Sequence, residues 1–323
     1  MRQEKLLAVG EAHLALVPEE AYESLKEANE YIREPGGSPV NVSRAATKWG
    51  ARVEYAGKLG KDPFGDYLAR LLPECEIGTS YLSQTHLAPT RVLFRSQADG
   101  GERLLIQSSS ADRLLRPDDI EKDWIDYGDI TYFSSQPLSQ SPSRGAIEKL
   151  VNIAGEKGAI VAFAPQVNLD EWPNETLARE TILYNIPYAH ILIISEEELK
   201  FFTEKEDEFL AIKKLFSGKT KCMIIMRGNK GITYVTERDK GNIRYAMEDI
   251  VDPAGMDDAF IGYLLSDLLK QQVTADQLTG YLMDAFSLEE RLVKALDYRY
   301  KTARKRGSFF AMTDGNGLSA SLS

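Results

Sequence analysis

Short apolar runs alternate with helical patterns along most of the chain. Between the runs, amphipathic spacing predicts helices over Val42–Trp49, Phe64–Leu72 and Arg144–Ala154. This alternation predicts an α/β fold in which helices cover both faces of a mostly parallel sheet. The runs, which have the continuous apolar character of buried parallel strands, are Leu6–Val9, Val53–Tyr55, Ile130–Phe133, Ala159–Phe163, His190–Ile194 and Cys222–Met226.

Two pairs of segments are more polar and predict hairpins outside this repeat. Arg91–Gln97 and Glu102–Ser108 flank a turn that contains two glycines, and the alternation of their side chains leaves one face polar. We expect this hairpin to project from the main sheet. Ile232–Thr236 and Asn242–Met247, joined through Asp239-Lys240-Gly241, predict a second hairpin.

The end of the chain is predicted to be helical from Thr274 to Arg306. This segment finishes in a basic stretch, Lys301–Arg306, which is typical of a solvated helix end that complements the helix dipole. A nucleic-acid patch is the less favoured interpretation of that stretch. The residues from Asp314 onward are small and polar, and we expect a loose end there.

Composition narrows the class of protein. The 323 residues are 43% hydrophobic and 27% charged, which is enough for a sizeable core, and the net charge of -10 disfavours a general nucleic-acid binder. No apolar run approaches the roughly 18 to 20 residues that span a bilayer, and the first residues lack a signal-peptide layout. Two cysteines are too few for a disulfide framework or a four-cysteine zinc site. We therefore expect a cytoplasmic globular protein without nucleic-acid or membrane partners.

The most informative segment lies late in the chain, where Gly255 precedes a predicted helix. Apolar residues at 256, 260, 261, 264 and 265 have helical spacing, so Gly255 sits where a turn enters a helix N-terminus. Free N–H groups and the positive end of the helix dipole make such a turn an anion site. Asp258, in the first turn, can either cap the helix or take a proton from a hydroxyl beside a bound phosphate.

Two glycine-containing turns occur near the N-terminus. Gly36 and Gly37 lead into a predicted helix and allow the backbone to approach a ligand closely, while Asn41 offers a donor and an acceptor to a polyol. An ordinary turn remains the alternative interpretation of this glycine pair. Gly57–Gly65 is a second turn of this kind, between a strand and a helix.

Two further turns follow predicted strands. Ser195 and Glu198 have the spacing of a capping box at a helix start, and Glu198 could also hold a metal-bound water. Capping is the simpler role for Glu198 alone. Gly228 lies in a tight turn, Arg227–Gly231, after the last buried strand.

Taken together and in this order, these segments resemble the PfkB (ribokinase-like) family of sugar kinases, and within it the fructokinases. The resemblance extends from Gly10 to about Gly307. It implies a single ribokinase-like domain over residues 1–323, a three-layer α/β/α sandwich with a mostly parallel sheet and a small β-sheet lid from about 11–38 and 90–110. The matching motifs are Gly36–Asn41, Gly57–Gly65, Ser110–Leu115 and Gly255–Asp258.

The resemblance also implies an activity and assigns roles. The protein would transfer the γ-phosphate of ATP to a sugar hydroxyl, with Asp258 as the general base, Gly255 amides stabilising the transferred group, Mg²⁺ as the cofactor and K⁺ as a possible second ion. Family members often pair through the lid, so a homodimer is expected. His13 is the one histidine expected near the lid, and a structural role is its alternative. The implied sugar-binding residues are Gly36, Gly37, Asn41 and His13, the implied nucleotide-binding residues are Gly228, Ser195, Asp257 and Met256, and the implied metal residue is Glu198.

Several residues depart from the family pattern where the chemistry is expected. Asp257 stands where the signature has glycine, and Met256 is larger than the usual residue beside it. Two like charges ~4 Å apart repel by about 4 kcal/mol at an effective dielectric near 20. Unless a cation or an outward rotamer intervenes, Asp257 would therefore weaken the binding of a phosphate.

Other positions that the resemblance assigns to ligand binding also depart from the family pattern. Ala15 stands where fructokinases carry Asp, Ala164–Asn168 replaces Asp-x-Asn-x-Arg, and Ser195 replaces the Asn of Asn-x-x-Glu. Two hypotheses remain open. The first is a sugar kinase with an unusual substrate, which uses Asp258 as its base. The second is a catalytically impaired relative that serves as a binding or assembly protein, in which Asp258 is only a helix cap.

Overall fold

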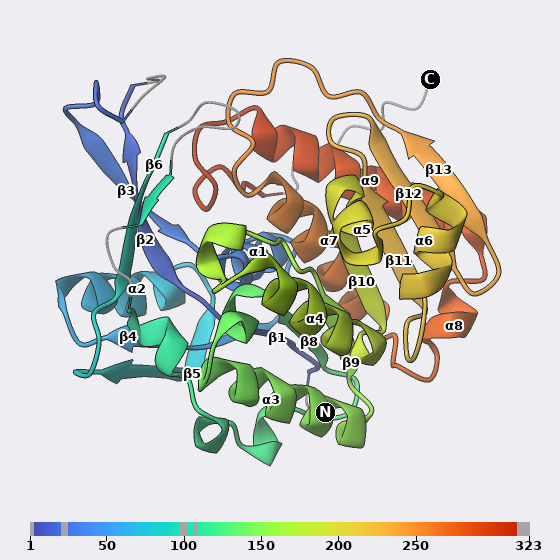
Figure 1. Cartoon of the computed structure of the whole chain (residues 1–323), viewed down its shortest axis with the longest axis horizontal. Coiled ribbons are helices and arrows are strands. Elements are labelled where there is room, and N and C mark those ends of the chain that lie inside the picture. Colours follow the sequence, from blue (N-terminus) through green and yellow to red (C-terminus); the bar gives the residue numbers. More distant parts are fainter. Residues whose placement is uncertain (1–2, 21–24, 97–102, 106–108, 315–323) are drawn as a thin grey trace.

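Within the described residues, a nine-stranded sheet forms the centre of the molecule (Figure 1). The computed structural model describes residues 3–20, 25–96, 103–105 and 109–314. The strand order is β13-β12-β11-β10-β9-β8-β1-β4-β5, and only β12 and β13 at one edge run antiparallel to their neighbours. The strands are β1 Leu6–Val9, β4 Val53–Gly60, β5 Gly78–Thr85, β8 Ile130–Phe133, β9 Ile160–Phe163, β10 Ile191–Ser195, β11 Cys222–Met226, β12 Gly231–Thr236 and β13 Lys240–Arg244.

Helices cover both faces of this sheet because successive side chains of each strand point to opposite sides. In β1, Leu6 and Ala8 join the core under one helix layer, while Leu7 and Val9 join the core under the other. The first layer contains α1 Ser38–Lys48, α2 Pro63–Glu74, α7 Met256–Lys270 and α9 Ala285–Ala303, with the short α8 Leu278–Tyr281 beside it. The second contains α3 Ser143–Lys157, α4 Glu175–Asn185, α5 Glu196–Thr203 and α6 Glu208–Leu215.

A separate four-stranded sheet, called the lid here, lies at the left of Figure 1. Its order is β3-β2-β6-β7, and β2 and β6 pair in parallel. The central sheet, its two helix layers and this small sheet confirm the predicted fold class. The lid strands are β2 His13–Pro18, β3 Tyr31–Gly36, β6 Arg91–Arg95 and β7 Arg103–Leu105.

Four element predictions need correction. Strand β4 continues to Gly60, so Gly57–Gly60 of the predicted turn belong to that strand. The second strand of the late hairpin begins at Lys240 and ends at Arg244, so the predicted turn residues Lys240 and Gly241 are part of it. The C-terminal helical segment is interrupted before α9, because the Asp284 side chain accepts a hydrogen bond from the Ser287 N–H and starts a new helix. The edge strand β5 was not predicted, because its half-exposed residues lack a continuous apolar run. Parts of the predicted first hairpin, residues 97–102 and 106–108, lie outside the described residues.

The packing of α1 against α7 brings two distant N-termini together. A Cβ at Gly262 in α7 would lie 2.4 Å from Cβ of Ala45 and 2.7 Å from the carbonyl oxygen of Val42, so only glycine permits this approach. The first turns of α1 and α7 therefore lie side by side. No helix in the described part of the chain is long and apolar enough to cross a membrane.

Candidate active site

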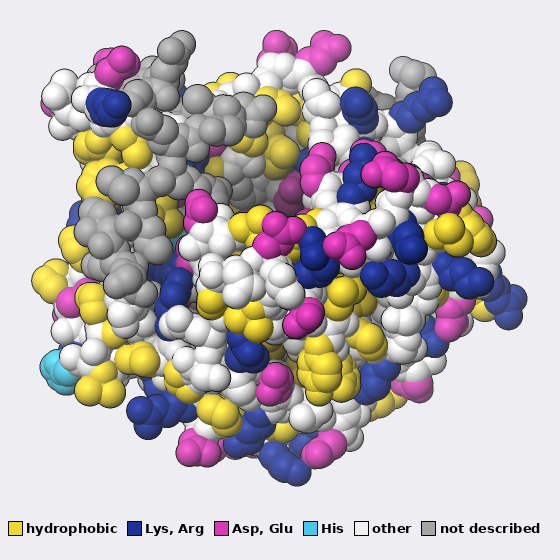
Figure 2. Space-filling model, in the orientation of Figure 1, with side chains coloured by type: hydrophobic (Ala, Val, Ile, Leu, Met, Phe, Trp, Pro, Cys, Tyr) yellow, Lys and Arg dark blue, Asp and Glu magenta, His cyan; other side chains and the backbone are white. Residues whose placement is uncertain are grey.

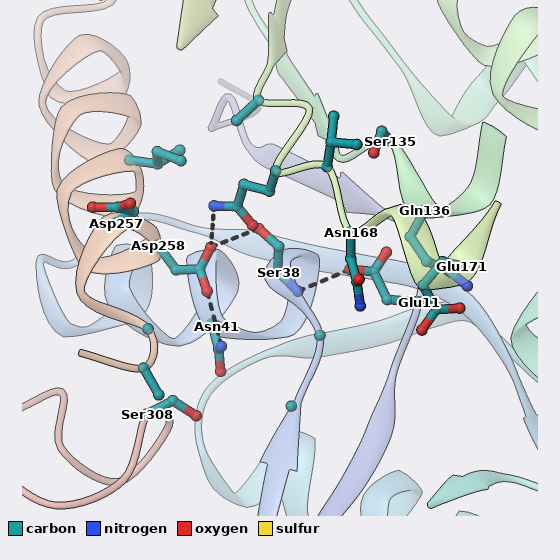
Figure 3. Close-up of a pocket in the computed structure, with 18 of the residues that line it drawn as sticks. Glu11, Ser38, Asn41, Ser135, Gln136, Asn168, Glu171, Asp257, Asp258 and Ser308 are labelled. Carbon is teal, nitrogen blue, oxygen red and sulfur yellow. Dashed lines mark hydrogen bonds between the residues drawn. The ribbon is translucent and has the colours of Figure 1, made fainter. Parts of the chain in front are cut away.

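A cavity of about 680 Å³ lies between the lid and the carboxyl ends of the central strands (Figure 3). Residues that follow β8 and β9 or end β10 and β11 line it, together with the first turns of α1 and α7. In open α/β sheets, ligands bind in this crevice outside the carboxyl ends of the strands. The cavity is therefore the candidate site.

Asp258 is buried at the α1 side of the cavity, with 6% of its surface exposed. Its Oδ1 accepts hydrogen bonds from Ser38 Oγ at 2.6 Å and from Gln166 Nε2 at 2.9 Å, and its Oδ2 accepts one from Asn41 Nδ2 at 2.9 Å (Figure 3). Burial raises the pKa of Asp258, and these three hydrogen bonds oppose the rise. A carboxylate of this kind can accept a proton from a hydroxyl that reaches it.

The N-terminus of α7 lies at the wall of the cavity. Its N-cap, Gly255, has φ 72°, and a Cβ there would lie 2.7 Å from Cβ of Ser308. Gly255 has no side chain to cap this end of the helix, and among the described residues of the turn Gly255, Asp257 and Asp258 line the cavity. The positive end of the helix dipole therefore lies beside the cavity, where it would favour an anionic ligand.

Asp257 has a cationic partner that its sequence position did not reveal. Arg299, a side chain of α9 with 1% of its surface exposed, donates from Nε to Asp257 Oδ1 at 2.6 Å. Its Nη1 donates to the carbonyl oxygen of Gly228 at 2.7 Å and contacts Met247 Sδ at 3.3 Å. The expected repulsion between Asp257 and a bound phosphate is therefore offset by a guanidinium group, and Gly228 is joined to the turn through the same arginine.

Glu198 forms the predicted capping box of α5. Its Oε2 accepts from the Ser195 N–H at 2.8 Å, while Ser195 Oγ accepts from the Glu198 N–H at 3.0 Å. Its Oε1 accepts from the Val167 N–H at 2.8 Å, and burial raises its pKa. The described residues contain no group of three or more metal-ligating side chains. A divalent cation near Glu198 would therefore need phosphate oxygens and water as its other ligands.

The lid side of the cavity is less polar than the family pattern predicts. Ala15 of β2 pairs in register with Leu93 of β6, and both line the cavity. The His13 ring lies over Gly36, since a Cβ at Gly36 would be 2.2 Å from His13 Nε2. At Ala15 and His13 the lid surface therefore presents a methyl group and an imidazole to the cavity, and no carboxylate.

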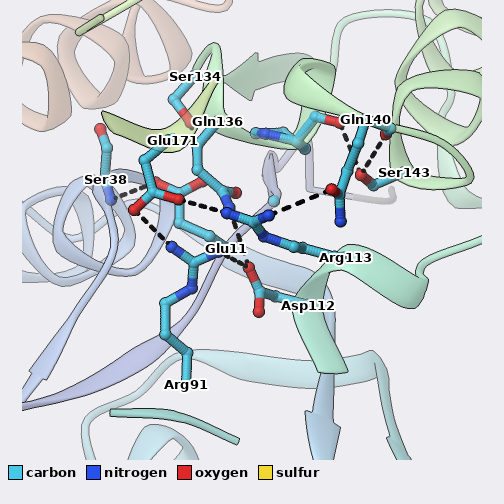
Figure 4. Close-up of polar contacts among 12 residues, drawn as sticks. Glu11, Ser38, Arg91, Asp112, Arg113, Ser134, Gln136, Gln140, Ser143 and Glu171 are labelled. Carbon is cyan, nitrogen blue, oxygen red and sulfur yellow. Dashed lines mark hydrogen bonds and ion pairs between the residues drawn. The ribbon is translucent and has the colours of Figure 1, made fainter. Parts of the chain in front are cut away.

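A second polar network, which the sequence analysis did not predict, lies at the other end of the cavity (Figure 4). Glu171 accepts from Arg91 Nη1 at 2.8 Å and from Arg113 Nη2 at 2.6 Å, and Arg91 Nη2 lies 3.0 Å from Asp112 Oδ2. Burial raises the pKa of Glu171, but the two guanidinium groups more than compensate and hold it below its ordinary value. Arg113 and Asp112 lie in the Ser110–Leu115 motif, which was the one available signal.

Glu11 is the buried carboxyl between these two regions. Its Oε1 accepts from the Ser38 N–H at 3.0 Å, and its Oε2 accepts from Ser134 Oγ at 2.8 Å. Burial raises its pKa from 4.5 to about 7, against the hydrogen bonds and the charge of Arg91. Glu11 thus supports the first turn of α1, which carries Ser38 and Asn41.

A buried ion cluster ties the lid to the turn before α7. Arg95 of β6 donates to Asp252 Oδ1 at 3.0 Å and to Glu34 Oε2 of β3 at 3.3 Å. Asp252 has 0% exposure and accepts from the Gly307 N–H at 3.0 Å, and Glu34 accepts from the Ser308 N–H. The two lid strands and the turn before α7 are therefore held as one unit.

The predicted site residues are mostly brought together. Gly228 and Met256 are not among the residues that line the cavity, whereas the other predicted residues are. Among the described residues that line the cavity, carboxylates outnumber cations: there are seven carboxylates and two guanidinium groups, and both guanidinium groups are paired. On the outer face drawn in Figure 2, Lys and Arg side chains are interspersed with Asp and Glu. The lining carboxylates are Glu11, Asp170, Glu171, Glu197, Glu198, Asp257 and Asp258.

The sequence and the fold of the chain are similar to those of known proteins. The model of the "pfkB family carbohydrate kinase" family matches residues 3–279. A probable fructokinase-4 of Arabidopsis thaliana is 32% identical over 275 residues, covering 84% of this chain and 84% of the relative. The fold is similar to that of a fructokinase with bound ATP from Xylella fastidiosa, with TM-score 0.88, 23% identity and coverage of 97% and 96%. It is also similar to a fructokinase of Vibrio cholerae that holds fructose, ADP and potassium, with TM-score 0.86, 22% identity and coverage of 97% and 96%.

The ion pair of Arg299 with Asp257 predicts a stability effect. Arg299→Met leaves the Gly228 carbonyl and the Asp257 carboxylate, whose side chain is 40% exposed, without their donor, so we expect the free energy of unfolding to fall by about 2 kcal/mol. Lys294→Met is the matched control, because Lys294 pairs with Glu290 on the exposed face of the same helix, and should cost less than about 0.5 kcal/mol. Urea unfolding measures both values, and equal losses would contradict a structural role for the pair of Arg299 with Asp257.

Glu11 predicts a pH dependence of stability. Because its folded pKa of about 7 exceeds its ordinary value of 4.5, the folded protein binds this proton more tightly, and stability falls as pH rises between those values. Glu11→Gln keeps an acceptor for the Ser38 N–H and lacks the titration. The unfolding free energy of the wild type should therefore fall relative to the variant by about 3 kcal/mol from pH 4.5 to 7. Parallel curves for the two proteins would show that Glu11 does not titrate in this way.

Proposed function

The chain belongs to the pfkB family of carbohydrate kinases, and we propose that it transfers the terminal phosphoryl group of ATP to a hydroxyl group of a sugar. The observation that carries this proposal is the Asp258 carboxylate, which is buried in the first turn of α7 and faces the cavity beside an uncapped helix N-terminus. Phosphoryl transfer to an alcohol uses a base for the hydroxyl proton and a site for the phosphate charge, and here the two would lie in the same helical turn.

In the proposed step, Asp258 takes the proton of the sugar hydroxyl. The hydroxyl oxygen forms a bond to the γ-phosphorus, the bond from that phosphorus to the bridging oxygen breaks, and ADP leaves with the electron pair. The amides from Gly255 to Asp258 would stabilise the charge on the transferred group. Arg299 supports this role, because it offsets the carboxylate of Asp257 at the same turn.

The proposed acceptor is a sugar held between the lid and α1. Asn41 lines the cavity next to Asp258, and Gly36, Gly37 and His13 form the adjoining wall. Fructose is the first candidate, because it is the sugar that the names of the relatives indicate. Ala15 lacks the carboxylate that fructokinases place at this position. We therefore expect this protein to bind fructose less tightly than a fructokinase that has the carboxylate.

The proposed nucleotide site lies across the carboxyl ends of β10 and β11. Ser195, Asp257 and the turns that contain Gly228 and Met256 would surround ATP, and Mg²⁺ would enter with the phosphates. Glu198 would contact that ion through water, since both of its oxygens already accept backbone N–H groups. Mg²⁺ would supply charge neutralisation for the phosphates. K⁺ remains part of the proposal, and comparing assays in potassium and sodium buffers tests it.

A second candidate function is a binding or assembly role without turnover. Asp258 already accepts three hydrogen bonds from the protein, and Ala15 and Ala164 stand where the family pattern has carboxylates. In this case the only role of Asp258 is to hold α7 against α1 through its hydrogen bonds to Ser38 and Asn41. The kinetic experiment below separates the two functions.

A homodimer through the lid and a cytoplasmic location also remain proposals. Ile32, on strand β3 of the lid, is 44% exposed, which leaves apolar surface for a second copy to cover. Light scattering of the purified protein and of Ile32→Lys would test the pairing. A monomer at micromolar concentration in the wild type would contradict it.

The acidic lining predicts that ATP binding depends on a divalent cation. Because carboxylates outnumber guanidinium groups around the cavity, free ATP meets like charge, and Mg²⁺ removes much of that repulsion. In calorimetric titration, we expect affinity for ATP to be at least about tenfold higher with Mg²⁺ than with EDTA, a difference of roughly 1.4 kcal/mol. Equal affinities would mean that the nucleotide does not lie against these carboxylates.

The kinase proposal is tested by Asp258→Asn. Asparagine keeps the size of the side chain but removes the base, so kcat for the best sugar in an ADP-release assay should fall by about 10² to 10⁴. Asp276→Asn, on the protein surface, is the control and should leave kcat unchanged. If no sugar is turned over by the wild type, or if Asp258→Asn matches it, the kinase function is wrong and the binding role is favoured.

A further inference from the structure

Gln166 covers the cavity side of the Asp258 carboxylate. It follows strand β9, its side chain is exposed, and it lines the cavity. From there its Nε2 donates to Asp258 Oδ1 at 2.9 Å. The other two donors, Ser38 and Asn41, are 8% and 6% exposed and belong to α1. Among the described donors to Asp258, Gln166 is thus the one that approaches from the exposed side.

The backbone holds Gln166 in this place at a conformational cost. Its φ is 48°, a left-handed conformation that side chains other than glycine rarely adopt and that costs about 1 to 2 kcal/mol. Its neighbours are fixed on both sides: the carbonyl oxygen of Pro165 accepts from the Ser135 N–H at 2.9 Å, and the Val167 N–H donates to Glu198 at 2.8 Å. Strain of this kind occurs where the surrounding structure over-determines a position, often in functional sites.

We propose that Gln166 is a positioning residue whose amide occupies the place of the acceptor hydroxyl on Asp258 Oδ1, so that a substrate must displace it before proton transfer. This inference rests on the proposed function and deepens it. An amide N–H and a sugar O–H are both donors to a carboxylate, so one can exchange for the other. While Gln166 is in place, its hydrogen bond stabilises the charged carboxylate and makes it a weaker base.

The reach of the Gln166 side chain and its hydrogen-bond donor can be tested separately. Gln166 stands in the segment Ala164–Asn168, where the family pattern has asparagine, and glutamine reaches one methylene group further. Gln166→Asn shortens the reach, and Gln166→Met keeps the length without the donor. Gln84→Met is the matched control, because Gln84 Nε2 also donates to an aspartate, Asp66 Oδ1, at 2.9 Å on the protein surface.

The first readout does not require turnover. In the ligand-free protein with ¹³C-carboxyl-labelled aspartate, the Asp258 signal is the one that Asp258→Asn removes. We expect Gln166→Met to move its titration midpoint to higher pH, and Gln84→Met to leave it unchanged. Asp257, which raises the pKa of Asp258, and Tyr132, whose pKa Asp258 helps to raise, are unaltered in both variants. An unchanged midpoint in Gln166→Met would overturn the inference.

The second readout is kinetic. For a sugar that the wild type phosphorylates, kcat/KM should rise about threefold to tenfold in Gln166→Met and Gln166→Asn, because no hydrogen bond has to be exchanged. The acid limb of the pH profile of kcat/KM should move to higher pH in Gln166→Met and should stay in place in Gln84→Met. A fall in kcat/KM in both Gln166 variants would mean that the amide assists the reaction and would overturn the proposal.

The two readouts separate this inference from the proposed function. If the midpoint moves in Gln166→Met but no sugar is phosphorylated by any variant, Gln166 covers Asp258 and the kinase function fails. If Asp258→Asn abolishes turnover but Gln166→Met changes neither the midpoint nor kcat/KM, the kinase function stands and the inference about Gln166 fails.

Discussion

The site depends on one constraint: the Asp258 carboxylate is buried, and a buried carboxylate needs hydrogen-bond donors. Ser38 and Asn41 supply them from the first turn of α1, more than two hundred residues earlier in the chain. Gly262 allows α1 and α7 to approach closely enough for these bonds to form. The same packing places Gly255, Asp257 and Asp258 of the α7 N-terminus at the cavity wall, so the burial of one carboxylate fixes the position of the whole turn.

Charge compensation explains how Asp257, which stands where the family signature has glycine, is compatible with the proposed anion site. Asp257 would oppose a phosphate, but the buried Arg299 pairs with it and also holds the carbonyl of Gly228. Arg95 has a comparable role with Asp252 and Glu34, where it joins the lid to the turn before α7. In both places a guanidinium group from a distant element balances an acid close to the turn, and the turn is held in position as a result.

The sequence predicted the central sheet, the main helices and the glycine turn of α7, because these follow from local periodicity and from motifs. It failed where partners are far apart. Arg299 gave no signal for its pairing with Asp257, and the contact of Gln166 with Asp258 depends on a left-handed backbone that no local pattern encodes. The break before α9 and the exposed strand β5 were missed because a side-chain cap and a half-exposed edge leave little trace in hydrophobic periodicity.

A crystal structure of the protein with Mg²⁺ and a non-hydrolysable ATP analogue tests most directly whether the α7 N-terminus binds the phosphates. We expect the terminal phosphate oxygens to lie within hydrogen-bond distance of the amides at the start of α7, with Asp258 facing the space beyond them. A nucleotide bound away from this turn, or a cavity that excludes the analogue, would contradict this expectation.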